Sequence, residues 1–217
     1  EATAQATFQD MFIGNYDPNW KNGTIDDLGT IVSGGTPSTT KPEYYCANGI
    51  PWITPKDLSL NSSKFIYRGK IDISEFGLKN SSAKILPKGS VLFSSRAPIG
   101  YIAIAANDVT TNQGFKSIIP VDEIGTAFVY FFLKQNLSII EGRASGSTFK
   151  EVSGTTMKSV PAVIPDVKKL NEFNLLCVPI FNKQKKVEAE NQRLAAIRDA
   201  LLSKLMSGEI DVSQVKI

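Results

Sequence analysis

The stretch IFNKQKKVEAENQRLAAIRDALLSKLMSG, residues 180–208, has the most regular pattern in the chain. It contains no glycine or proline before Gly208, which stands where a residue just beyond a helix end is expected. Its apolar side chains form one stripe that repeats about every seven residues: Ile180, Val187, Leu194, Ile197, Leu201 and Leu205. The pattern predicts a long α-helix whose apolar seam pairs with another helix.

Two interpretations of this stripe are open. An amphipathic helix can bury such a stripe against its own domain. We favour pairing with a partner helix, because the segment is long and mostly charged outside the stripe. At about 1.5 Å per residue it spans on the order of 40 Å, which exceeds one turn of B-DNA at roughly 34–36 Å.

The helical pattern begins further upstream, at Asp166, which is suited to cap a helix. Pro179 either sits in the first turn of a second helix or kinks a single one. We therefore assign residues 166–210 to a spacer or dimerisation helix.

Residues 20–165 differ from this helix in their pattern. Short β-favouring segments alternate with Gly, Pro and Asn-rich turns, which predicts a mixed, strand-rich domain with exposed loops. Helices are expected within it at residues 122–135 and 153–159. Residues 1–14 predict a further short helix that buries Ala6, Phe8, Met11 and Phe12. The predicted fold class is α+β, a strand-rich domain followed by a long coiled-coil-forming helix.

Missing residue types exclude several kinds of active site. The chain has no histidine, so a Ser-His-Asp triad, a Cys-His nucleophile and a histidine-ligated zinc site are impossible. It also lacks the glycine-rich phosphate-binding loop and the dinucleotide-binding fingerprint. The paired carboxylates Asp26-Asp27 and Asp122-Glu123 are interpreted as helix caps and turns. We therefore expect a non-catalytic protein without metal or cofactor.

Charge and cysteine content say less about function. The net charge of +3 permits a DNA partner without arguing for one. Cys46 and Cys177 are interpreted as reduced structural thiols, with a single disulfide left open. The chain has neither a run of roughly 20 apolar residues nor a signal-peptide pattern. A cytoplasmic protein without a membrane partner is expected.

Several segments together resemble the specificity subunits of type I restriction-modification systems. They are residues 28–37 (LGTIVSGGTP), 43–45 (EYY), 49–58 (GIPWITPKDL), 86–100 (LPKGSVLFSSRAPIG), 111–115 (TNQGF), 146–150 (GSTFK) and 201–208 (LLSKLMSG). Residues 6–13 and 16–18 are similar to the end of a preceding spacer helix in that family. Family members usually carry two recognition domains and two spacers, so a half-subunit or a C-terminal fragment is expected, with residues 1–14 as the spacer remnant.

The resemblance implies that residues 20–165 form a target-recognition domain that reads one half of a split site in double-stranded DNA. The long helix would pair with a second copy or a second spacer, and so fix the distance between the two half-sites. A separate modification subunit would supply adenine methylation, and a restriction subunit would join indirectly. The rival hypotheses are a protein-interaction module that does not bind DNA and a methyltransferase fragment.

Candidate DNA contacts lie in the matched loops and strand ends. Arg96 can bond guanine, Asn112 or Gln113 can bond adenine, and lysines suit phosphates. The full candidate set is Gly35, Thr36, Lys56, Ser94, Ser95, Arg96, Asn112, Gln113, Lys116, Ser147, Thr148 and Lys150. Structural alternatives are also open: turns at the glycines and at Asn112, and an ion pair that anchors a carboxylate at Arg96. Tyr44, Tyr45 and Trp52 are expected in the core.

Overall fold

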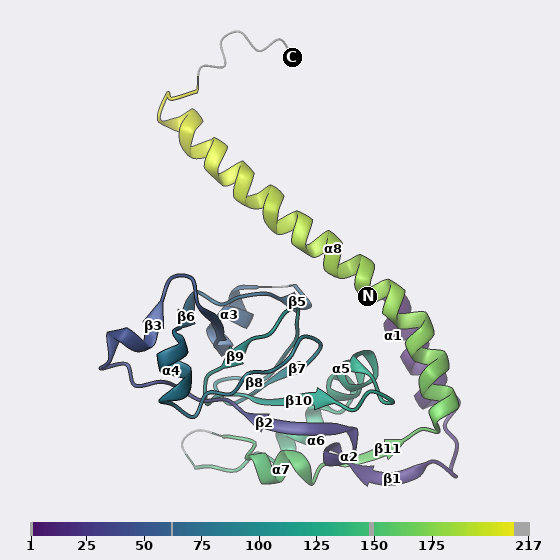
Figure 1. The fold of residues 1–217 in the computed structure, drawn as a ribbon. Helices are drawn as coiled ribbons and strands as arrows, with labels where there is room; N and C mark the ends of the chain where they lie inside the picture. The colour runs from purple at the N-terminus through teal and green to yellow at the C-terminus, as the bar shows by residue number, and fades with distance from the viewer. Residues whose placement is uncertain (1, 62, 148–149, 211–217) are drawn as a thin grey trace, which may run out of the picture.

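The structure is a computed structural model that describes residues 2–61, 63–147 and 150–210. Two β-sheets form the framework of the head, the name used here for the folded part of the chain before residue 167. In these residues a five-stranded sheet has the order β2 (Gly29–Ser33), β10 (Lys116–Pro120), β7 (Val91–Ser95), β8 (Ile99–Ala105) and β5 (Phe65–Ile66). A four-stranded sheet has the order β3 (Tyr45–Cys46), β6 (Ile71–Ile73), β4 (Ile50–Ile53) and β9 (Thr110–Thr111). A β1 (Lys21–Thr24) and β11 (Pro161–Ile164) pair closes the base of the head (Figure 1). The β4–β9 and β5–β8 pairs are parallel and the others antiparallel, so the sheets are mixed.

The helices are short, except for one. They are α1 (Ala2–Gln9), the π-helical η1 (Asp10–Gly14), α2 (Ile25–Leu28), the 3-10 turn η2 (Pro42–Tyr44), α3 (Pro55–Leu60), α4 (Glu75–Lys79), α5 (Thr126–Gln135), α6 (Leu137–Gly142), α7 (Gly154–Lys158) and α8 (Val167–Met206). Strand-rich sheets followed by one long helix confirm the predicted α+β class.

The five-stranded sheet is covered on both faces, which explains why every residue of β7 is buried. Side chains alternate along a strand, so Val91 and Phe93 join one apolar cluster while Leu92 joins another. The larger cluster contains α5, α1 and the start of α8. Its centre is a set of aromatic rings whose centroids lie 5.0–6.4 Å apart: Phe8, Phe12, Phe128, Phe131 and Phe173.

Three predicted helices exist with altered limits. The helix expected from residue 122 begins at Thr126, because Gly125 adopts φ +80° and residues 122–124 form a turn. The helix expected at residues 153–159 is α7, capped by the Ser153 side chain. In the first helix Phe8 and Phe12 are buried as expected. The assignment of Ala6 to the buried face was wrong: it is exposed, because Ala4 occupies the stripe four residues before Phe8.

Helix α8 is continuous, with Pro179 inside it, so a single helix is found rather than two. Its first part packs on the head through Leu170, Phe173, Cys177 and Phe181. Gly208 has φ +75°, the left-handed conformation expected just beyond a helix end. The local interpretation of the apolar stripe therefore applies to the start of α8, and pairing with a partner helix stays a prediction for its remainder.

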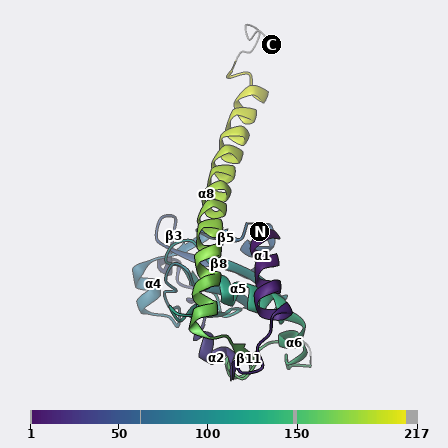
Figure 2. The ribbon, with the colours of Figure 1, turned by 90° about the vertical axis from the view of Figure 1, so that its right-hand side faces the viewer.

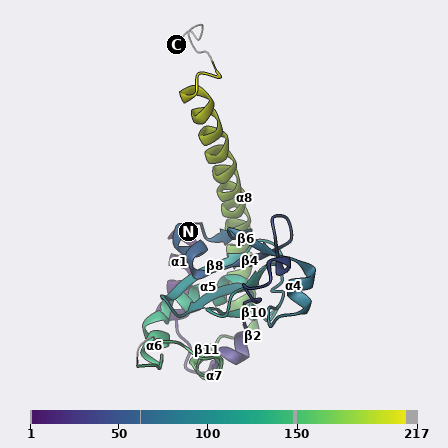
Figure 3. The same ribbon diagram turned by 90° about the vertical axis from the view of Figure 1, so that its left-hand side faces the viewer.

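Polar contacts hold α8 to the head where the apolar contacts end. The Lys185 ammonium donates to the Ala106 carbonyl, and Glu188 accepts the Phe65 N–H at 3.0 Å. Gln192 reaches Ser63 Oγ at 3.5 Å. Beyond this point α8 rises clear of the head in all three views (Figures 1, 2 and 3). The head and the start of α8 thus set the direction of a projecting rod.

The predicted seam is exposed along α8 from Val187 onward. Val187, Leu194, Ile197, Leu201 and Leu205 are 38–51% exposed. Leu194 follows Gln192 by two residues, about 200° around the helix, so the seam faces away from the side that contacts the head. Ile180 differs from the prediction: it packs partly against the core of its own head and lies before the exposed seam begins.

The two cysteines are both free thiols, so the disulfide left open by the sequence is not formed. Cys46 is exposed, whereas Cys177 is buried against the head. Burial raises the pKa of the Cys177 thiol to about 11, which keeps it protonated and unreactive at neutral pH. In the described part of the chain, no helix is long and apolar enough to cross a bilayer.

We expect Asp166→Ala to destabilise the fold by about 1 kcal/mol, the usual effect of losing an N-cap. Asp166 accepts the Lys169 N–H at 2.9 Å and the Trp20 Nε1–H at 3.2 Å, so it joins α8 to the N-terminal segment. Chemical denaturation at pH 7 measures this loss. Asp166→Asn keeps a capping oxygen and is the matched control.

The same carboxylate makes part of the stability depend on pH. The backbone N–H of Lys169, followed by the Trp20 side chain, lowers the pKa of Asp166 below its ordinary value. The stabilisation is therefore fully present above that ordinary pKa and is lost as the pH falls through the lowered pKa. In acid the Asp166→Asn protein should lose less stability than wild type. Equal losses in the two proteins would contradict the proposed role of Asp166.

Candidate nucleic-acid interface

Candidate contact residues from separate parts of the sequence meet around the turn between β9 and β10, residues 111–116. The backbone N–H of Gly34 donates to Phe115 O at 3.2 Å, and that of Gly35 donates to Thr111 O at 2.9 Å. Ser95 N–H donates to Gly114 O at 2.8 Å, so the end of β7 joins the same turn. The fold thus brings together three segments that the sequence analysis could only treat separately.

The glycines of the first segment are needed for close backbone contact. A Cβ on Gly34 would lie 2.0 Å from Asn112 O, and one on Gly35 would lie 2.4 Å from the Ser82–Ala83 backbone. Gly35 is buried, and its carbonyl accepts the Trp52 indole N–H at 3.0 Å. Trp52 is a core residue, as expected. Gly35 therefore positions the neighbouring turn, and Thr36 lies half-buried beside it.

Asn112 and Gln113 have different roles in the turn. Asn112 Oδ1 accepts the Gly114 N–H at 2.9 Å, and the Asn112 backbone N–H donates to Ile53 O at 3.0 Å. This is the turn-supporting role left open by the sequence. Gln113 is exposed, and its side chain makes no internal hydrogen bond within the part of the chain that the structure describes. Of the two amides, Gln113 is the one available to a base.

Ser94 and Ser95 are fully buried at the end of β7. The Ser94 hydroxyl donates to Pro98 O at 2.8 Å and accepts the Tyr101 N–H at 2.8 Å. The Ser95 hydroxyl donates to Gly114 O at 3.1 Å. Both hydroxyls shape the β7–β8 hairpin and the 111–116 turn, and in this conformation neither is offered to a ligand.

Arg96 and Lys116 share one acidic partner, Glu151. Arg96 Nη1 lies 3.5 Å from Glu151 Oε2, and Lys116 Nζ lies 3.1 Å from Oε1. Lys116 is buried, while the Arg96 and Glu151 side chains are about one-third exposed at 36% and 34%. Glu151 was not among the predicted residues. Its position one residue after the GSTFK segment was the only sequence signal for it.

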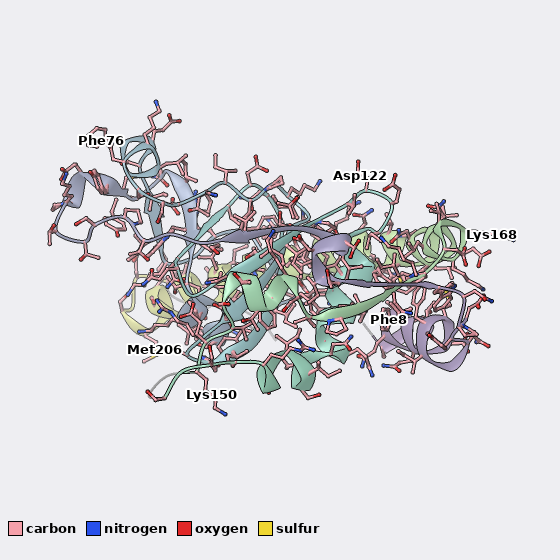
Figure 4. The ribbon with its side chains drawn as sticks, turned by 90° about the horizontal axis from the view of Figure 1, so that it is seen from below. Phe8, Phe76, Asp122, Lys150, Lys168 and Met206 are labelled. Atoms are coloured by element: carbon pink, nitrogen blue, oxygen red, sulfur yellow. The ribbon has the colours of Figure 1, made fainter. Side chains whose placement is uncertain are left out.

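Ser145 and Glu151 flank the segment that carries Ser147 and Lys150. Its two ends are joined by reciprocal backbone bonds between Ser145 and Glu151, of 3.1 and 2.9 Å. Ser147 and Lys150 are exposed within it, and Lys150 extends outward at the edge of the head (Figure 4). Thr148 lies outside the described residues.

Lys56 occupies the first turn of α3, beside the same surface. Thr54 and Asp57 form a capping box there, with the Asp57 N–H to Thr54 Oγ1 distance at 3.4 Å. Pro55 lies 3.3 Å from the position that a Cβ on Gly114 would take, so α3 abuts the turn. The Lys56 side chain is exposed. Gln113, Arg96, Lys56, Lys150 and Ser147 therefore remain as outward-facing candidates.

The described residues at this surface do not form a metal site. The described residues contain no group of three or more Cys, Asp or Glu side chains able to hold a metal ion. The surface consists of cations, an amide, one carboxylate and backbone groups. These are the groups by which proteins contact phosphates and base edges.

Curated relatives match most of this chain. The type I restriction enzyme MjaIX specificity subunit of Methanocaldococcus jannaschii is 42% identical over 163 residues, which is 74% of this chain and 38% of that protein. The HindI specificity subunit of Haemophilus influenzae is 32% identical over 194 residues, 88% of this chain and 42% of that protein. The chain thus spans about two-fifths of the length of these relatives.

Solved structures share its fold. The HsdS subunit from Thermoanaerobacter tengcongensis superposes with a TM-score of 0.59 at 18% identity, covering 96% of this chain and 51% of that one. The type I restriction-modification S subunit from M. genitalium gives 0.58 at 18% identity, covering 91% and 48%. A family model described as the type I restriction modification DNA specificity domain matches residues 18–197. The chain therefore belongs to the family of type I restriction-modification DNA specificity domains.

Proposed function

We propose that this chain is a non-catalytic DNA-recognition unit of a type I restriction-modification complex, reading one half of a bipartite site in double-stranded DNA. Residues 20–165 act as the target-recognition domain and residues 166–210 as the spacer helix. Residues 1–14 correspond to the end of a preceding spacer. It acts on DNA in the cytoplasm and binds a modification subunit directly and a restriction subunit indirectly.

The main support for the proposal is the way the fold gathers the candidate contact residues. Segments spread over residues 34–151 are joined around the 111–116 turn, and Arg96, Gln113, Lys56 and Lys150 on or beside these segments are partly or fully exposed. Loops placed on a rigid scaffold are the usual location of binding residues. Arg and Gln suit the major-groove edges of guanine and adenine, and lysines suit phosphates.

The rod supplies the second half of the proposal. Its exposed seam is apolar and regular, and isolated helices with such seams pair to remove the seam from water. We propose that α8 pairs with the α8 of a second copy or with another spacer. Two heads are then held apart by a helix longer than one turn of DNA.

The test is binding to duplex DNA by this chain together with its modification subunit. Selection from randomised duplexes should retain a defined sequence. Affinity for that sequence should fall steeply between 50 and 200 mM salt, with a log–log slope of roughly −0.9 per phosphate contact. Lys150→Ala should weaken binding to all sequences alike and reduce that slope by about one contact.

Ser59→Ala is the control for the lysine variant, since Ser59 is exposed on α3 and its hydroxyl donates to Lys56 O at 2.7 Å. It should leave affinity and slope unchanged. If no duplex is retained sequence-selectively at low salt with the modification subunit present, the rival assignment of a protein-interaction module is favoured.

A further inference from the structure

Glu151 is a carboxylate at the centre of a surface proposed to bind a polyanion. Its Oε1 is held by Lys116 at 3.1 Å and its Oε2 faces Arg96 at 3.5 Å. Lys116 is buried, and no other described ion pair involves Glu151. The Glu151 carboxylate is thus held by the shorter contact with Lys116 inside the fold, and by the longer contact with Arg96 at the surface.

The backbone fixes where these side chains start. Glu151 is joined to Ser145 by two backbone hydrogen bonds, and the next residue, Val152, donates its N–H to Ser95 O at 3.0 Å. Ser95 directly precedes Arg96. The side chains of Arg96 and Glu151 therefore start from two neighbouring backbone segments that are hydrogen-bonded to each other. About one-third of each side chain is accessible to a ligand.

A carboxylate at this place is unfavourable near phosphates, because like charges repel. It is favourable opposite a hydrogen-bond donor of a base. In the major groove, cytosine presents its N4 amino group as such a donor, and guanine presents O6 and N7 as acceptors. A carboxylate beside a guanidinium matches the order of these groups on one C·G base pair, since Arg bonds guanine and Glu accepts from cytosine.

We propose that Arg96 and Glu151 act as a unit that reads one C·G base pair, with Arg96 on the guanine and Glu151 on the cytosine. Lys116 is the positioning residue that holds Glu151. The proposal rests on the proposed DNA-recognition function and adds the base pair and the second reader to it. The Arg96–Glu151 contact of 3.5 Å is long. Arg96 therefore loses little interaction energy with Glu151 when it bonds guanine instead.

The experiment compares sequences retained from randomised duplexes by wild type, Arg96→Ala and Glu151→Ala, each with the modification subunit. The wild-type half-site should contain a C·G pair, and both variants should relax preference at that same position. The affinity for the wild-type site should fall roughly 10- to 100-fold, with other positions unchanged. Glu151→Gln keeps the size of the side chain and one acceptor oxygen, and should weaken the C·G preference less than Glu151→Ala does, which separates readout from simple misfolding.

A further arm tests the positioning role. Lys116→Met removes the cation below Glu151 while filling its buried space, and should weaken preference at the C·G position alone. Lys150→Ala is the control, since it should lower affinity for all sequences without changing the selected site. Relaxation at two different positions, or at none, while wild type still selects a defined site would overturn the Arg96–Glu151 unit and leave DNA recognition standing. A wild type that selects no site would overturn the proposed function itself.

Discussion

Leu194→Asp combined with Leu201→Asp should abolish pairing through α8. Each leucine is about half exposed in the single chain, 51% and 46%, and is covered when the seam meets another helix. Covering a leucine contributes roughly 1.5–3 kcal/mol at full burial, and a carboxylate in its place must be desolvated as well. We expect the association constant of the double variant to be at least 100-fold below that of wild type, a difference on the order of 3 kcal/mol. Sedimentation equilibrium over a concentration series measures it.

The matched control carries the same added charge on the other side of the rod. Ala196 and Ser203 each follow a seam leucine by two residues, about 200° around the helix, and both are exposed. Ala196→Asp with Ser203→Asp should leave association close to that of wild type. A wild type that stays monomeric at high concentration, or a leucine variant that pairs like the control, would show that this seam is not the interface.

Phe173→Ala should cost about 3–5 kcal/mol of unfolding free energy, as expected for a buried phenylalanine that leaves a cavity. Phe173 is fully buried and comes from α8, and its ring lies 5.9 Å from that of Phe8 and 5.1 Å from that of Phe12. It therefore joins the rod, the N-terminal helix and the head in one cluster. Against a typical total of roughly 5–15 kcal/mol, this loss is large. Urea denaturation followed by circular dichroism measures it.

Leu175→Ala is the control for this variant, because Leu175 lies two residues further along α8 and is 76% exposed. It should change stability by no more than about 0.5 kcal/mol, as expected for an exposed site. A loss for Phe173→Ala as small as that of the control would mean that α8 is not anchored through its first turns. The rod would then not hold the head at a defined angle.

Much of the architecture follows from local patterns. The seam of α8, the Asp166 cap and the Gly208 end depend on residues within a few turns of one another, so helical periodicity was enough to predict them. The α+β class followed likewise from short β-favouring segments between turn residues. The same physics explains the small errors, since local propensity does not say which side chain meets the core. Ala6 was misassigned for that reason, and Ile180, predicted to belong to the pairing seam, packs partly against its own head.

The candidate interface depends on contacts that periodicity cannot express. Ser94 and Ser95 looked like polar loop residues, but pairing of β7 with its neighbours and the 111–116 turn buries their hydroxyls in internal bonds. Glu151 was not singled out in the sequence, but the backbone hydrogen bond from Val152 N–H to Ser95 O brings it to Arg96, 55 residues away in the chain. The helical and strand segments, the family resemblance and the regular apolar seam of α8 follow from the sequence alone, because they depend on neighbouring residues. Only the tertiary structure decided which polar groups are consumed inside the fold and which face outward, because hydrogen-bond partners distant in sequence compete for each one.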